Sequence, residues 1–136
     1  MTEQDKKLLL QDLCARLPYG IIVEVMDIND SAYHKKGVLC KVSNTDSNCN
    51  GTKFLFAVDG ETCLCDITEI KPYLRPMSSM TEEEKYEFNE LPTISSSIQS
   101  LSINEIDFLN AHHFDYRGLI EKGLALEASE GMYKIF

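Results

Sequence analysis

The side chains best suited to catalysis or metal binding lie in one short stretch, at His112, His113 and Asp115. An imidazole beside a carboxylate can perform acid–base catalysis, and both groups bind zinc. Neighbouring residues on an α-helix point about 100° apart, so the two His can share a ligand only if the helix ends between them. The zinc-protease pattern of two His four residues apart is absent. A helix end with Asp115 as a cap residue explains the cluster more simply, so an enzyme built on it is the alternative hypothesis.

Cysteines offer a second candidate metal site, at Cys14, Cys40, Cys49, Cys63 and Cys65. Alternation along a strand puts Cys63 and Cys65 on one side, but structural zinc sites usually need C-x₂₋₄-C and a second such pair. No spacing among the other cysteines supplies that pair, and a free thiol packs like a small apolar side chain. A phosphate loop is also absent, because Gly118-x₄-Gly123 is not followed by Lys-Ser/Thr. We therefore predict no metal and no cofactor.

Two Tyr/Arg pairs indicate recognition rather than catalysis: Tyr73 with Arg75, and Tyr116 with Arg117. Tyr and Arg anchor binding surfaces because each combines apolar area with a polar tip. The alternative is that both Tyr close the edge of the core while each Arg pairs with an acid of the acidic helix. These four residues are the interaction candidates.

Charge favours a protein partner. The net charge is −9, of which residues 1–75 carry −2 and residues 76–136 carry −7. An acidic chain lacks the basic surface of a general nucleic-acid binder. Nucleic-acid binding through a local basic patch, at Lys35, Lys36, Lys41 and Lys53, is therefore the third and weakest hypothesis. An acidic face in the second half fits a basic protein partner, and solubility alone also explains it.

The first half predicts a helix followed by a sheet. Thr2 and Asp5 resemble an N-cap and its N3 partner, and apolar residues at helical spacing predict a helix over residues 3–17. Strands are expected at Ile21–Ile28, Gly37–Ser43, Lys53–Asp59 and Thr62–Ile67, with loops at Asn29–Lys36 and Asn44–Thr52. A turn at Asp59-Gly60 would place Val58 opposite Glu61, Phe56 opposite Cys63 and Phe54 opposite Cys65, burying both thiols beside the rings.

The second half predicts an extended segment and short helices. Pro72 and Pro76 favour an extended edge segment over 70–76. Thr81 and Ser102, each followed three residues later by Glu, predict capping boxes that open two helices. The Ser-rich 93–100 segment is expected to be a flexible connection, and 124–128 a last short strand. Apolar residues of 103–126 need a surface, and Tyr73 and Leu74 are the expected contacts.

The prediction is one α+β domain over 1–136: an N-terminal helix, a four-stranded antiparallel meander in a bent sheet or partial small barrel, and C-terminal helices packed on it. Residues 1–76 would form the helix and sheet, and 77–136 a helical cap. No apolar run is long enough to span a bilayer and no signal peptide precedes the fold, so we expect a cytoplasmic protein with reduced thiols.

The strings IKPYLRPMSSMTEEE (Ile70–Glu84) and FLNAHHFDYRGLIEKGLALEA (Phe108–Ala128) resemble a group of small uncharacterised proteins from Bacteroides-type gut bacteria and their phages or other mobile elements. The resemblance covers about half of the chain. It implies no activity and assigns no functional residue, because none is assigned to the group. The leading hypothesis is a non-enzymatic interaction protein, an accessory factor of a mobile element, that meets a protein partner through its acidic second half.

Overall fold

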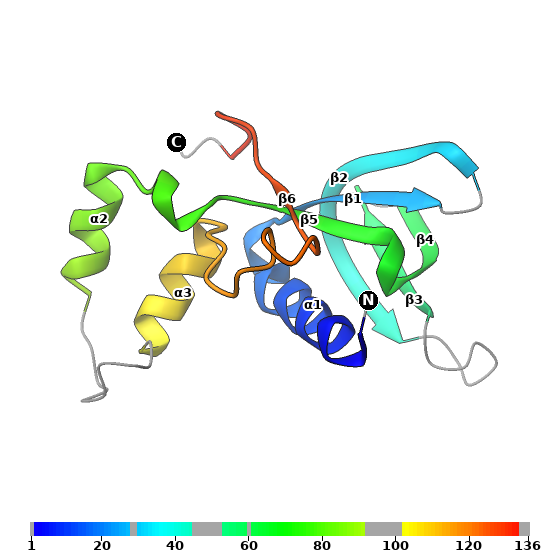
Figure 1. Cartoon of the computed structure of the whole chain (residues 1–136), viewed down its shortest axis with the longest axis horizontal. Coiled ribbons are helices and arrows are strands. Elements are labelled where there is room, and N and C mark those ends of the chain that lie inside the picture. Colours follow the sequence, from blue (N-terminus) through cyan, green and yellow to red (C-terminus); the bar gives the residue numbers. More distant parts are fainter. Residues whose placement is uncertain (1, 28–29, 45–52, 60, 92–101, 134–136) are drawn as a thin grey trace.

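The computed structural model describes residues 2–27, 30–44, 53–59, 61–91 and 102–133, leaving the side chains of 27, 30–34, 44, 53–55 and 62–65 undescribed. Short 3₁₀ turns lie at Leu17–Tyr19, Ile67–Glu69 and Met77–Ser79. The helices and strands, labelled in Figure 1, are α1 (Glu3–Arg16), β1 (Ile22–Asp27), β2 (Asp30–Asn44), β3 (Lys53–Val58), β4 (Glu61–Asp66), β5 (Ile70–Leu74), α2 (Glu82–Asn89), α3 (Ile103–Ala111) and β6 (Leu126–Glu127). The predicted α+β class is confirmed.

The sheet is open and mixed, with the strand order β4-β3-β2-β1-β5-β6. Strands β1 to β4 are consecutive antiparallel neighbours, as the meander prediction requires. The prediction of only four antiparallel strands is wrong. A fifth strand, β5, pairs antiparallel with the other side of β1, and the two-residue β6 pairs parallel with β5.

Strand β5 accommodates Pro72 because of the hydrogen-bond alternation along β1. The Leu39 N–H of β2 donates to the Ile21 carbonyl (2.9 Å), so odd-numbered residues here bond to β2 and even-numbered residues face β5. Pro72 lies opposite Val23, an odd-numbered position, so its nitrogen, which carries no hydrogen, turns away from β1. The predicted extended segment is therefore a real strand, and Pro72 costs it no bond to β1.

The expected loop over Asn29–Lys36 is wrong for residues 30–36, which extend β2. They pair with β1, where Lys36 lies opposite Glu24 and Lys35 opposite Val25. Strand β3 pairs only with the later part of β2, from Leu39 onward. The early part of β2 thus has one neighbouring strand. Its residues show no apolar alternation, so the sequence pattern did not predict a strand there.

Between β3 and β4 the predicted hairpin register is confirmed: Val58 lies opposite Glu61, Phe56 opposite Cys63 and Phe54 opposite Cys65. Phe56 is fully buried. The predicted burial of the two thiols falls on side chains outside the described set. The turn is held by Asp59, whose carboxylate accepts the Val38 N–H (2.8 Å) and covers Gly37, where a Cβ atom would overlap it.

Helix α1 begins as predicted, because the Thr2 hydroxyl accepts the Asp5 N–H and the Asp5 carboxylate accepts the Thr2 N–H. It ends at Arg16, one residue before the expected end, where a 3₁₀ turn containing Pro18 follows. Its buried Leu9 and Leu13 belong to a single apolar core with residues of β1, β2, β3 and β5 and of the 119–125 segment. In Figure 1, α1 lies beside the sheet, while α2 and α3 lie together at the far end from β3 and β4.

The two distinctive motifs touch, as predicted. Tyr73 and Leu74 of β5 pair with Leu126 and Glu127 of β6, inside the expected 124–128 strand. Immediately after β5, the Arg75 N–H donates to the His113 carbonyl (2.8 Å). The 93–100 segment falls outside the described residues. Among the helices that are described, none combines the length and apolarity needed to cross a bilayer.

Candidate functional site

The side chains of His112, His113 and Asp115 do not converge on one site. Helix α3 ends at this point, as predicted, because His112 is the C-cap and His113 has a left-handed backbone (φ 62°). The Asp115 carboxylate accepts the N–H groups of Leu119 (2.8 Å) and Ile120 (3.0 Å), so it caps the following turn. His112 faces α2, whereas His113 packs on Tyr133.

Among the Tyr and Arg candidates, one pair contacts β1 and α2. The Tyr73 hydroxyl donates to the Glu24 carboxylate (2.8 Å). Arg75 donates to both oxygens of Glu84 on α2, each at 2.7 Å, and its guanidinium lies over the Phe114 ring, 4.2 Å from the centroid. For Arg75 this is the pairing with an acid of the acidic helix that the sequence offered as an alternative.

The second pair contacts α1 and α3. Arg117 donates to Asp12 (2.7 Å), and the Tyr116 hydroxyl donates to Asn110 (2.9 Å). All four candidates are therefore bonded within the chain, and their role as partner contacts stays a prediction.

A buried charge network joins α1 to the C-terminal half, and sequence reasoning missed it. Arg16 and Asp12 are both fully buried and bond to each other (2.9 Å). Arg16 also donates to the Phe114 carbonyl (2.5 Å), while Asp12 accepts from Arg117. The available signal was the spacing: Asp12 and Arg16 are four residues apart on the same helix face as buried Leu9 and Leu13.

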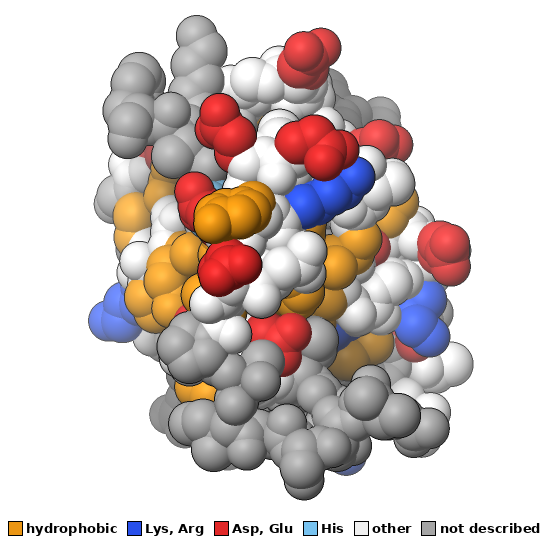
Figure 2. Space-filling model, turned by 90° about the vertical axis from the view of Figure 1, so that its left-hand side faces the viewer, with side chains coloured by type: hydrophobic (Ala, Val, Ile, Leu, Met, Phe, Trp, Pro, Cys, Tyr) orange, Lys and Arg blue, Asp and Glu red, His pale blue; other side chains and the backbone are white. Residues whose placement is uncertain are grey.

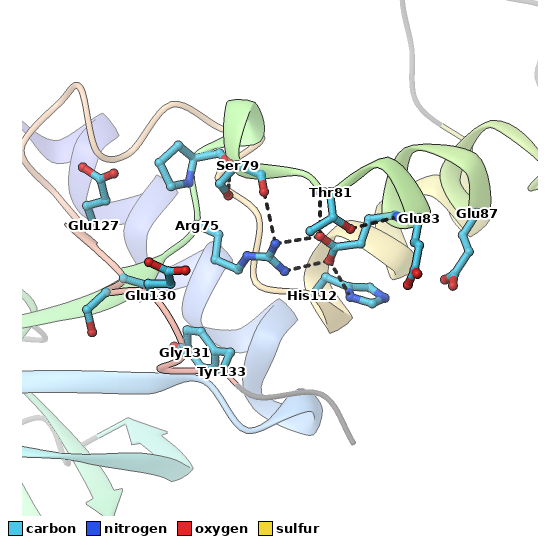
Figure 3. Close-up of a pocket in the computed structure, with 14 residues that line it drawn as sticks. Arg75, Ser79, Thr81, Glu83, Glu87, His112, Glu127, Glu130, Gly131 and Tyr133 are labelled. Atoms are coloured by element: carbon cyan, nitrogen blue, oxygen red, sulfur yellow. Dashed lines mark hydrogen bonds and ion pairs between the residues drawn. The ribbon is translucent and has the colours of Figure 1, made fainter.

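A cleft of about 750 Å³ lies between α2 and the segment Leu126–Tyr133. Figure 3 shows Arg75 and His112 in its middle, Glu83 and Glu87 on the α2 side, and Glu127 and Glu130 on the opposite side. We call it the acidic cleft. Its two walls come from segments about forty residues apart, which are brought together because Leu74 of β5 accepts the Ala128 N–H (2.8 Å).

At the floor of the acidic cleft, the charges of Arg75 and Glu84 balance each other. The hydrogen bonds from Arg75 lower the pKa of Glu84 to about 2, against the opposing effect of burial, and the backbone N–H of Thr81 contributes further. Glu84 thus stays ionised and neutralises Arg75. His112 Nδ1 lies 3.2 Å from Glu84 Oε2 without hydrogen-bond geometry, and its ring packs on Phe108, 4.2 Å between centroids.

The four wall carboxylates remain exposed and uncompensated. Among the described residues, no ion pair or hydrogen bond engages the side chains of Glu83, Glu87, Glu127 or Glu130. The cleft therefore carries an excess of negative charge. Figure 2 looks onto the α2–α3 end and shows acidic side chains spread over this face, with few basic ones.

Chemically, this arrangement can bind a cation-bearing ligand. Within the described part of the chain, no cluster of three or more His, Cys, Asp or Glu side chains is arranged to hold a metal ion. Sequence reasoning located the negative charge in the second half but not its concentration in a cleft. Comparison of the chain with protein-family models, with curated proteins and with solved structures found no match.

Proposed function

We propose that this protein is a non-enzymatic interaction protein whose acidic cleft binds a basic, extended segment of a partner protein. The observation that carries the proposal is the pair of facing walls, Glu83 and Glu87 on α2 and Glu127 and Glu130 on the C-terminal segment. The single guanidinium between them, Arg75, is already bonded to Glu84.

Two properties of the cleft favour a peptide over a small molecule. Small-molecule sites are mostly apolar enclosures with a few polar groups, whereas here four exposed carboxylates line the two walls. Lys and Arg side chains on an extended chain point alternately to opposite sides. Such a chain lying between the walls can present cations to both at once, and the complementary charge would give specificity and rapid association.

The other hypotheses gain less support. An acid–base enzyme using His112, His113 and Asp115 would need these side chains in one site, and they face different parts of the chain. In the basic patch proposed for nucleic acid, Lys35 pairs with Glu61. Cytoplasmic location and an accessory role in a mobile element are proposals that rest on the sequence alone.

A binding assay tests the proposal with a fluorescein-labelled peptide of about nine residues that alternates Lys or Arg with Ser. Each exposed ion pair contributes up to about 1 kcal/mol, so neutralising one wall should weaken binding roughly tenfold. The variants are Glu83→Gln with Glu87→Gln, and Glu127→Gln with Glu130→Gln. The affinity should also fall as the salt concentration rises.

The matched control is Glu3→Gln with Glu121→Gln, which removes the same charge from exposed positions outside the cleft. It should leave the affinity within about twofold, since long-range charge alone is screened at physiological salt. Equal weakening by the control and the wall variants would show that net charge, not the cleft, attracts the peptide. Absence of binding by the unaltered protein would also refute the proposal.

A further inference from the structure

The hydroxyl group of Tyr133 occupies a missing step of the β1–β5 ladder. Residues Val23–Val25 of β1 pair with Ile70–Pro72 of β5, and the next step would join Ile22 to Tyr73. Instead, the Tyr133 hydroxyl accepts the Ile22 N–H (2.8 Å) and donates to the Tyr73 carbonyl (2.8 Å). One side chain near the C-terminus therefore bridges two strands that separate at this point.

His113 holds the ring of Tyr133 in that position. The two rings stack with centroids 3.8 Å apart and an interplanar angle of 24°. His113 is only 6% exposed, and its Nδ1 has no hydrogen-bond partner among the described residues. This imidazole supports Tyr133 by packing in its neutral form.

Three neighbouring side chains act electrostatically on His113. Arg16 of α1, His112 at the end of α3 and Arg75 after β5 all act on it to disfavour its protonation. The carboxylates of Asp12 and Glu84 are bonded to Arg16 and Arg75, so they are not available to pair with His113. A proton added to His113 would therefore create a buried cation with no anionic partner among the described residues, which is strongly unfavourable.

The segment Leu126–Tyr133, which we call the C-terminal strap, forms part of two cavities. It supplies the wall of the acidic cleft that carries Glu127 and Glu130. Met132 and Tyr133 also line a smaller cavity of about 360 Å³ beside His113. Strand β6 keeps Leu126 and Glu127 paired with β5. Movement of residues 130–133, beyond β6, would open both cavities and would move the Glu130 carboxylate away from the α2 wall.

We propose that the C-terminal strap is an acid-released closure of the acidic cleft, in which protonation of His113 expels Tyr133 from between β1 and β5. Its effect on ligand binding rests on the function proposed above. The strap's own movement does not, because the Tyr133 bridge and the His113 stack exist in the chain without a ligand.

The direction of the pH effect follows from the pKa of His113. Burial, together with the electrostatic effect of Arg16, His112 and Arg75, lowers that pKa from 6.5 to about 4. With the strap released, His113 would regain its ordinary value. The closed form is therefore favoured fully above pH 6.5 and loses that advantage as the pH falls towards 4. This pKa difference between the released and the closed form raises the released fraction by up to a few hundred-fold at acid pH. Burial raises the pKa of Tyr133, so its hydroxyl stays protonated as a donor throughout.

Hydrogen exchange at the Ile22 amide measures strap release, because its N–H bonds to Tyr133. We expect the Ile22 protection factor to fall by a factor of ten or more between pH 6.5 and 4. The amides of Leu39 and Asp59, bonded to Ile21 and Val38, serve as internal controls and should keep their protection. Unchanged Ile22 protection, or equal loss at the control amides, which reports unfolding of the sheet, would overturn the proposal.

His113→Asn removes the titrating group with a residue that tolerates left-handed backbone, and should abolish the pH dependence at Ile22. His112→Asn is the matched control and should retain it. Tyr133→Phe keeps an aromatic ring but removes the bridge, so the strap should be released more often and His113 more exposed. The pKa of His113, followed by NMR of its ring, should then rise towards 6.5. Equal pH dependence in both His variants, or an unchanged His113 pKa in Tyr133→Phe, would contradict the proposal.

Measuring peptide binding distinguishes failure of the strap proposal from failure of the proposed function. The comparison is between the unaltered protein and His113→Asn at pH 4.5, so that any effect of acid pH common to both proteins cancels. Loss of affinity should be several-fold smaller in His113→Asn. If no variant binds the peptide at any pH, the proposed function fails while the Ile22 exchange result still decides the strap.

Discussion

Among single residues, Arg75 determines the charge of the acidic cleft. Its guanidinium lies at the floor, yet both oxygens of Glu84 bind it, so among the described residues no cation is left for the wall carboxylates. The sequence offered Arg75 either as a partner contact or as a partner for the acidic helix. The second alternative could be predicted because Glu84 is also the N3 residue of a recognisable capping box.

We predict that Glu84→Gln removes a pH-dependent part of the stability. The folded pKa of Glu84 is about 2, below its ordinary 4.5. Its contribution is therefore present above pH 4.5 and is lost as the pH falls from 4.5 to about 2. The contribution should be on the order of 2–3 kcal/mol at neutral pH, measured by urea unfolding at several pH values.

The control for this experiment is Glu82→Gln, on the same helix but with a 91% exposed side chain paired only to Lys85. It should retain the steep loss of stability between pH 4.5 and 2. Parallel pH profiles for the two variants would mean that the Arg75–Glu84 pair contributes no net stability.

For helices and strands, the local signals were predictable, whereas of the tertiary contacts only the one between the two motifs was. Capping boxes at Thr81 and Ser102, and the β3–β4 register set by the Asp59 turn, depend on residues close in sequence. The β1–β5 pairing and the strap depend on backbone groups far apart in sequence, for which no side-chain pattern exists. The second wall of the cleft, Glu127 and Glu130, could not be predicted for that reason.

The capping boxes give a prediction for the starts of α2 and α3. Thr81→Ala and Ser102→Ala should each cost about 0.5–2 kcal/mol, because each hydroxyl accepts an N3 amide, at 3.2 Å in both cases. Ser78→Ala is the control, since Ser78 is exposed and caps no helix. Thermal unfolding measures the loss of stability in each variant. Losses near zero for both would show that the two caps do not stabilise the starts of these helices.

Taken as a whole molecule, the chain is tied together by charge as well as by its core. Asp12 of α1 accepts from Arg16 and from Arg117, which is 105 residues away, and Arg16 reaches the Phe114 carbonyl. This network fixes the segment after α3 against α1. The sequence predicted that the two halves touch but not that a buried ion pair would join them, because buried charges are rare.

Asp12→Asn should destabilise the protein by about 3–5 kcal/mol, since it leaves buried Arg16 without its anion. Asp107→Asn, at an exposed position on α3, is the control and should change stability little. Adding Arg16→Met to Asp12→Asn should recover part of the loss, because the uncompensated buried cation is then gone. Additive losses in the double variant, by urea unfolding, would contradict this account of the network.

NMR mapping of the basic peptide on the ¹⁵N-labelled protein shows directly whether the acidic cleft is the binding site. The amides of Glu83 and Glu87 and those of Glu127 and Glu130 should shift together, with one affinity, while those of β3 and β4 stay unchanged. Both walls must respond, because the ligand lies between them. Shifts confined to one wall, or centred on the sheet around Lys41, would contradict the claim.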